Sequence, residues 1–237
     1  RVSKWSYFFE FLIIIAGILV SFYLNEWRVE NKLIEKKQVL LKEIKQDLVA
    51  DSIYLEVGIR FYQEVLSSHD SLLLHITDQF EEDSLQDYLD HTISYFPFKE
   101  KQKTFLKIIN NQELTIEVED SLLSSFLMLH NVIYTSMHEW LSIEKDFVVG
   151  QLLPYMDKNA PFIYPTPPRR SFAGSVFYSL RKEDAFLNML KSGRLYKQAM
   201  LEVSTATLSF IKTLKANIDK ELEKELLGFS KQRPMGL

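Results

Sequence analysis

The chain has 237 residues, of which 25 % are charged, with a formal net charge of −4 and no cysteine. This composition excludes disulfides and cysteine-ligated zinc sites, and the lack of a basic excess argues against a nucleic-acid-binding protein. Seven glycines and seven prolines are too few for a β-rich fold with many tight turns, so we expect an all-α fold.

The first organised segment is a nearly unbroken apolar run from Tyr7 to Leu24. As a helix this run would cover roughly 27 Å, which is close to the hydrocarbon thickness of a bilayer. No small-residue cleavage site follows, which argues against a signal peptide. The sequence therefore predicts a transmembrane anchor over residues 1–27, with an interfacial belt of aromatic residues at Trp5, Tyr7, Tyr23 and Trp27.

Three residues within the anchor are candidates for a role in the membrane. Glu10 lies about one turn inside the apolar run, where a carboxylate is costly, so it either has a function or reaches the interface or stays protonated. Gly17 and Ser21 form a small-xxx-small pair that would let another helix approach closely. We expect the anchor to pack in a homo-oligomer or against other membrane-protein subunits.

Residues 28–65 are rich in helix-forming residues and carry a repeating apolar pattern. One apolar residue recurs every seven positions, namely Ile34, Leu41, Leu48, Leu55 and Tyr62. This pattern is typical of a coiled-coil seam, and the breadth of the apolar face favours packing in a bundle over a free coiled coil. We predict a long amphipathic helix to about residue 65, a helical bundle over 66–227, and a flexible tail over 228–237.

Two stretches that lie 81 residues apart predict the same arrangement of a short helix, a turn and a long helix. The first runs from Thr104 through a turn at residues 110–113 into a long helix that ends at Leu153. The second starts at Ala185 and has its turn at residues 191–194, where Gly193 suits a helix C-cap. We therefore expect an internal helix–turn–helix repeat whose long helices pack on each other.

Between these stretches, residues 154–170 hold five prolines and predict an extended surface loop. Arg169 and Arg170 at its end are candidates for binding an anionic head group or a partner's carboxylate. The alternative is a solvated pair of loop residues.

No motif in the chain indicates an enzyme. The five histidines lack the spacing of a zinc-binding helix, and neither a phosphate-binding loop nor a nucleophile elbow is present. Acidic clusters stand at the starts of predicted helices, where the helix dipole explains them. We expect no catalytic residue, no cofactor and no metal site.

Three stretches together resemble a family of uncharacterised single-pass bacterial membrane proteins. They are Glu-Phe-Leu-Ile-Ile-Ile-Ala-Gly-Ile-Leu from Glu10, Leu-Asn-Glu-Trp ending at Trp27, and Leu-Lys-Glu-Ile-Lys-Gln-Asp-Leu from Leu41. The resemblance extends to the Phe-Pro segment at Phe96 and the Asn-x-x-Leu turn that ends at Leu114. That family carries no assigned activity, cofactor or catalytic residue, so the resemblance implies none. It implies a shared anchor pattern that includes Glu10 and Trp27.

Charge alone does not decide which end of the anchor lies in the cytoplasm. Lysines and arginines are more numerous after the anchor than in the visible residues before it, which would place the body in the cytoplasm. The family resemblance implies the opposite, with the body in the periplasm, and a basic segment upstream of Arg1. We adopt the periplasmic orientation at the bacterial inner membrane.

These observations predict a non-enzymatic, single-pass membrane protein that acts as a scaffold, interaction module or accessory subunit of a membrane assembly. Its partners would be the lipid bilayer and other membrane helices. Two alternatives remain, a helical bundle that senses a ligand and shifts the anchor, and a proton-coupled or stator-like role for Glu10.

Overall fold

The computed structural model describes residues 4–74, 82–111, 121–159 and 180–232, and within these residues every regular element is a helix. The all-α prediction is confirmed. Two elements, η1 and η2, are π-helical turns that carry an extra residue. In chain order the elements are α1 (Lys4–Leu74), α2 (Glu82–Thr92), α3 (Lys103–Ile109), α5 (Ser121–Met128), η1 (Leu129–Tyr134), α6 (Thr135–Phe147), η2 (Val148–Leu152), α7 (Leu153–Asn159) and α9 (Asp184–Gln232).

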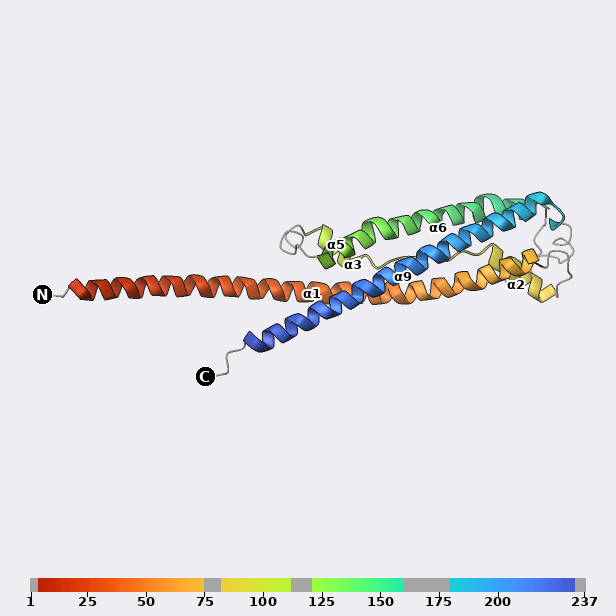
Figure 1. Ribbon diagram of the computed structural model, residues 1–237. Helices are drawn as coiled ribbons and strands as arrows, with labels where there is room; N and C mark the ends of the chain where they lie inside the picture. The colour runs from red at the N-terminus through yellow and green to blue at the C-terminus, as the bar shows by residue number, and fades with distance from the viewer. Residues whose placement is uncertain (1–3, 75–81, 112–120, 160–179, 233–237) are drawn as a thin grey trace, which may run out of the picture.

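Helix α1 is a single helix of 71 residues that dominates the molecule (Figure 1). Its apolar first part projects from the rest of the fold with no other helix beside it. Among the described residues, it is the one helix long and apolar enough to cross a membrane, and none of its apolar window is buried inside the protein. The helix continues to Leu74, well past the boundary expected near residue 65, because the chain from 59 to 74 contains no glycine or proline.

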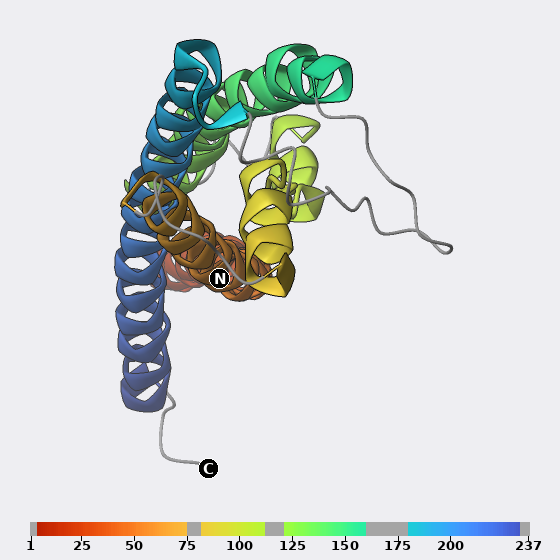
Figure 2. The same cartoon turned by 90° about the vertical axis from the view of Figure 1, so that its right-hand side faces the viewer.

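Three long helical segments form the body. The second half of α1 packs against α9, and α9 also packs against α6 and α5. Figure 2 looks along the body from its far end and shows α9 on one side of α1, α2 on the other, and the α5–α7 segment above them. The short helix α3 lies on α1 at the end of the body that faces the projecting part.

The buried positions of α1 and α9 follow an alternating three- and four-residue spacing. This is the spacing of two helices that wrap around each other. The seam of α1 comprises Leu41, Ile44, Leu48, Asp51, Leu55, Gly58, Tyr62, Val65, His69 and Leu72, all buried. The seam of α9 comprises Phe186, Leu190, Gly193, Lys197, Met200, Ser204, Thr207, Ile211, Leu214 and Ile218, also all buried. The predicted face of a packed bundle is confirmed from Leu41 to Tyr62, whereas Ile34, the first residue of the predicted repeat, lies before the seam and is only partly buried.

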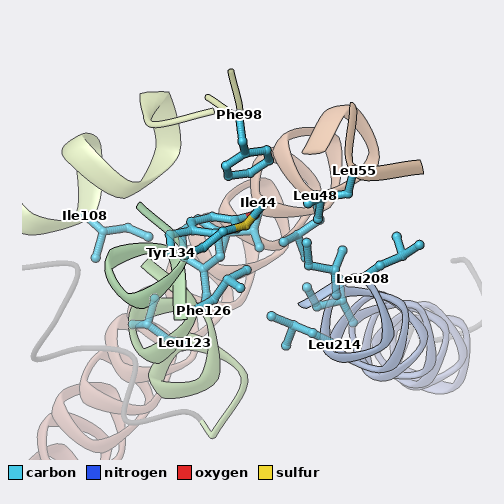
Figure 3. Close-up of a cluster of buried hydrophobic side chains, with 14 of the residues drawn as sticks. Ile44, Leu48, Leu55, Phe98, Ile108, Leu123, Phe126, Tyr134, Leu208 and Leu214 are labelled. Atoms are coloured by element: carbon cyan, nitrogen blue, oxygen red, sulfur yellow. The ribbon is translucent and has the colours of Figure 1, made fainter. Parts of the chain in front are cut away.

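The main core lies where α1, α9 and the α5–η1 segment meet (Figure 3). Leucine and isoleucine side chains of α1 and α9 face Phe126 and Tyr134 there, and Phe98 closes the top of the cluster. A second apolar cluster, which includes Leu72, Phe147 and Phe186, fills the far end of the body under α2 and α7. Of the α1 seam, the first cluster contains Leu41, Ile44, Leu48, Leu55 and Tyr62, and the second contains Leu72.

The proline-rich loop predicted over 154–170 does not begin where we expected. The segment from Ser121 is helical without interruption to Asn159, so Pro154 lies within helix α7. Proline lacks the N–H that a helix interior requires. The π-helical turn η2 comes immediately before it and changes the local hydrogen-bond pairing, which lets the helix accept the proline. The remainder of the predicted loop lies outside the described residues.

The turn predicted at residues 191–194 is absent, because α9 runs through it as one helix. Gly193 is buried inside the helix, where an added Cβ would lie 3.2 Å from both His69 Nε2 and Phe147 Cε1. The glycine therefore serves close packing between helices. In the first stretch α3 ends at Ile109, and Gln112 and Glu113 of its predicted turn lie outside the described residues, so the internal repeat remains unconfirmed. Residues 228–232, predicted as part of a flexible tail, continue α9.

Gly58 provides a direct test of this packing. A Cβ added there would lie 2.8 Å from two atoms of the Phe96 ring, closer than real contacts allow. We expect Gly58→Ala to lower the free energy of unfolding by about 1–3 kcal/mol, measured by urea titration with circular dichroism. The control is Gly150→Ala, because no atom lies within 4 Å of an added Cβ there. Equal stabilities of the two variants would contradict the packing of Phe96 on α1.

Candidate functional site

The predicted membrane residues lie on the uncovered part of α1. Glu10 is exposed, and no atom lies within 4 Å of a Cβ built at Gly17. The Ser21 hydroxyl donates a hydrogen bond to the Gly17 carbonyl, with 2.7 Å between the oxygens. This bond uses the Ser21 proton inside its own helix, so the Gly17–Ser21 surface is small and smooth, as close helix packing requires.

The other predicted site residues are less completely described. Tyr23 and Trp27 are exposed on α1, at the end of the apolar run where we placed the interfacial belt. Trp5 and Tyr7 are part of the same helix, but their side chains lie outside the described part of the structure. Arg169 and Arg170 also lie outside the described residues, so their proposed role in binding stays a prediction.

A buried ion pair with its hydrogen-bond partners, absent from our sequence-based predictions, joins four segments at the centre of the body. Lys197 of α9 and Glu144 of α6 are each 1 % exposed, and Lys197 Nζ donates to Glu144 Oε1 over 2.9 Å. The same amine donates to the Ser94 carbonyl, and the Tyr62 hydroxyl of α1 donates to Glu144 Oε2 over 2.6 Å. Both carboxylate oxygens are therefore satisfied, which offsets part of the cost of burying them.

The electrostatics of this group follow from its burial. Burial lowers the pKa of Lys197, although the neighbouring Glu144 carboxylate acts in the opposite direction. Burial, and then the charge of Glu144, raises the pKa of the Tyr62 phenol. No substrate could reach groups so enclosed, so the arrangement can hold helices together but cannot carry out catalysis. We call Tyr62, Glu144, Lys197 and the Ser94 carbonyl the central polar layer.

A second polar cluster fastens the irregular segment 93–102 to α1. Asp51 Oδ1 accepts the Lys101 backbone N–H over 2.8 Å, and its Oδ2 accepts the Tyr134 hydroxyl over 2.6 Å. One turn earlier, Asp47 Oδ2 accepts the backbone N–H of Thr104 over 3.0 Å. The first N–H groups of a helix lack partners within that helix. Asp47 therefore caps α3 from a different helix.

Burial raises the pKa of Asp51 to about 6, although the hydrogen bonds from Tyr134 and Lys101 act to lower it. Asp47 and Glu100 lie near enough to add to the increase. Glu100 behaves differently. Burial alone would raise its pKa, but hydrogen bonds from groups that include Gln102 and His138 outweigh burial and bring the pKa below its usual value.

Two of the histidines are core residues. His130 stacks on Phe105 with 4.5 Å between ring centroids and meets Phe126 and Tyr134 edge-on. His69 packs in the seam and shares a hydrogen bond with the Val65 carbonyl. Burial lowers the pKa of each to about 4, so both are neutral at pH 7. In the described part of the chain, no three acidic or histidine side chains gather as metal ligands would.

Beside the second polar cluster, which contains Asp51, an open groove of about 690 Å³ lies on the surface of the body. We call it the α1 groove. Its floor is α1, and one wall is the segment that carries three lysines. The residues that line it are Ala50, Asp51, Ile53, Tyr54, Val57, Lys99, Glu100, Lys101, Gln102 and Lys103.

Sequence reasoning missed Asp51, Glu144 and Lys197 because they are polar residues at buried positions. The seam has two buried positions in every seven residues. The apolar repeat that predicted the seam includes only one of them. The second position holds Ile44, Asp51, Gly58, Val65 and Leu72, a mixed set that looks irregular by hydrophobicity. If the alternating three- and four-residue spacing is applied to polar as well as apolar residues, it predicts Asp51 as a buried position.

Because the ion pair is buried, we expect a single substitution to lower the free energy of unfolding much more than the matching double substitution does. Lys197→Met should lower the free energy of unfolding by about 3–5 kcal/mol, because it leaves the Glu144 carboxylate buried without a cation. Glu144→Gln combined with Lys197→Met should recover most of this loss, since the amide still accepts from Tyr62. Urea titrations of both single variants and the double variant give the coupling energy. Additive losses would contradict a buried pair.

Asp51 predicts a pH dependence of stability. Because its pKa in the folded state lies above the unfolded value of 3.8, the folded state binds the proton more tightly. The contribution of Asp51 to the free energy of unfolding is therefore full at low pH and is lost as the pH rises from about 4 to about 6. Asp51→Asn should match the wild type near pH 4 and exceed it above pH 6 by about 2–3 kcal/mol.

The measurement for Asp51→Asn is the difference in unfolding free energy between variant and wild type across this range. His69 and His130 act in the opposite sense, because their lowered pKa makes stability fall as the pH drops from 6.5 to about 4. Both proteins contain these histidines, so the difference isolates Asp51. A difference that does not change with pH would contradict the raised pKa.

The chain was compared with protein-family models, with curated proteins and with solved structures, and none of the three comparisons found a match. The family resemblance inferred from the sequence therefore stays a prediction.

Proposed function

We propose that the protein is a non-enzymatic, single-pass membrane protein whose helical body serves as a scaffold or accessory subunit in a membrane assembly. The observation that carries the proposal is the continuity of α1. One helix is apolar and uncovered over its first part and then supplies the buried seam of the body. The lipid bilayer is the solvent that suits the first part.

The geometry suits a rigid support. Between Trp27 and Leu41, where the seam begins, α1 runs through fourteen residues, or roughly 21 Å of helix. This stretch contains no glycine or proline at which it could bend. A body held by such a rod would stand off the bilayer at a defined distance and turn with the anchor. That behaviour fits a subunit that positions a surface relative to other membrane proteins.

The polar groups of the body support a structural role. The buried charges of the central polar layer are paired with one another, and Asp47 and Asp51 hold backbone N–H groups. The α1 groove opens on the surface and does not enclose a converging set of catalytic side chains. We place the protein in the bacterial inner membrane with its body in the periplasm, as the family resemblance implies.

Membrane insertion is tested by charge substitution in the apolar run. Ile14→Lys combined with Ile18→Lys should release the chain from membranes, because each lysine at the centre of a spanning helix costs about 2.5–3.5 kcal/mol. The wild type should resist extraction with alkaline carbonate. Val132→Lys with Val149→Lys, both exposed positions on the body, is the matched control and should remain in the membrane. Carbonate extraction of the wild type would contradict the proposal.

Orientation is tested by labelling, for which the chain offers a clean background because it contains no cysteine. Ser142→Cys lies at an exposed position of α6 and should react with a membrane-impermeant maleimide in intact spheroplasts. Ser3→Cys, on the other side of the anchor, should react only after the membrane is permeabilised. The reverse pattern would place the body in the cytoplasm.

A further inference from the structure

The side of α1 that faces away from its seam is exposed along the body and carries apolar residues. Ile53 lies midway between the seam positions Asp51 and Leu55, so it points away from the core. It is 60 % exposed, Val39 is 48 % exposed and Val57 is 40 % exposed. We call Val39, Gln46, Ala50, Ile53 and Val57 the outer face of α1. Ile53 and Val57, one turn apart, form an exposed aliphatic surface that lines the α1 groove, where another protein could cover it.

The outer face is bordered by positive charge. Lys99 and Lys101 are exposed and alternate with Phe98 and Glu100, which are buried, so the lysines point outward along one wall of the α1 groove. Lys103 extends the wall at the start of α3. Among the described residues, none of these three lysine side chains takes part in an ion pair. An apolar floor with a basic border suits an occupant that combines apolar and acidic side chains.

The outer face continues into the predicted membrane segment. Gly17 and Ile53 are separated by 36 residues, which is about ten complete turns, so they lie on the same side of α1. Ser21 and Val57 have the same separation. Gly17 and Ile44 of the seam are 27 residues apart, or about seven and a half turns, and so lie on opposite sides. The small surface in the apolar run and the outer face of the body therefore lie on one line along α1, with the exposed charged residues Glu35 and Lys42 on the same line between them.

We propose that this line binds a single helix of a different membrane protein, whose part outside the bilayer carries apolar and acidic side chains. The inference rests on the proposed function, because it requires α1 to cross the bilayer. The partner helix would pack on Gly17 and Ser21 within the membrane. It would then follow the outer face to the α1 groove, where its acidic residues meet Lys99, Lys101 and Lys103.

Charge argues against a second copy of this chain as the occupant. Copies paired through the same face are related by a twofold axis, so each residue of the interface faces the same surface on its partner. Such a pair would bring outer face against outer face and leave the two lysine borders at opposite edges of the interface. The outer face, as defined by Val39, Gln46, Ala50, Ile53 and Val57, offers these lysines no carboxylate. A different partner with acidic residues at this level supplies the opposite charge.

The test uses the full chain in lipid nanodiscs and a synthetic amphipathic helix built of leucine and glutamate. Binding is measured by fluorescence anisotropy at low and high salt. We expect the peptide to bind the wild type, and Lys99→Glu with Lys101→Glu and Lys103→Glu to weaken binding about tenfold and remove its salt dependence. Ile53→Ser with Val57→Ser should weaken binding by a similar factor. A peptide with lysine in place of glutamate should not bind.

Matched controls carry the same changes elsewhere on the body. Lys158→Glu with Lys182→Glu and Lys191→Glu, and separately Val132→Ser with Val149→Ser, should leave binding unchanged because these exposed residues lie off the outer face. Equal binding by every variant would overturn the proposal. So would rapid disulfide formation between Ile53→Cys chains in native membranes, since that would place a second copy on this face. Failure of the chain to enter nanodiscs would instead contradict the proposed membrane function.

Discussion

The whole structure depends on one helix that is suited to two different surroundings. Over its first part α1 is apolar on every side, and no other helix covers it. Beyond Leu41 the seam of the same helix is buried in the core that it shares with α9 and the α5–η1 segment, while its outer face stays exposed. No glycine or proline lies between Gly17 and Gly58, so the apolar first part of α1 and the part that carries the seam keep a fixed angle about the helix axis. Consequently the direction of any membrane contact is tied to the direction in which the body faces.

Within the body, the buried polar groups of several helices meet in one layer. Leucine and isoleucine seams alone allow helices to slide by a heptad, whereas a buried ion pair must meet at one register. Lys197 and Glu144 match only when α9 and α6 are in the observed alignment, and Tyr62 adds α1 to the same layer. The arrangement costs desolvation energy, which is partly offset because every charged atom of the layer has a partner.

The segment 93–102 explains why α1 carries acidic residues on a buried side. This segment is neither helix nor strand, so its backbone N–H groups need partners from elsewhere. Asp51 accepts the N–H of Lys101 in this segment, and Asp47 caps α3, the helix that follows it, at Thr104. Asp47 is the aspartate of the Leu-Lys-Glu-Ile-Lys-Gln-Asp-Leu stretch that carries part of the family resemblance. Its geometry gives that stretch a structural reason, namely to hold the next element on α1.

The sequence by itself determined the helical class, the apolar segment and the seven-residue repeat, because each depends on composition or on spacing along one helix. It could not determine that Gly193 packs inside α9 or that Pro154 lies within a helix, since both depend on neighbours brought close by folding. The pairing of Lys197 with Glu144, 53 residues apart, and of Tyr134 with Asp51, 83 residues apart, likewise follows only from the tertiary structure. Local pattern records which residues share a helix face, and only packing decides which faces meet.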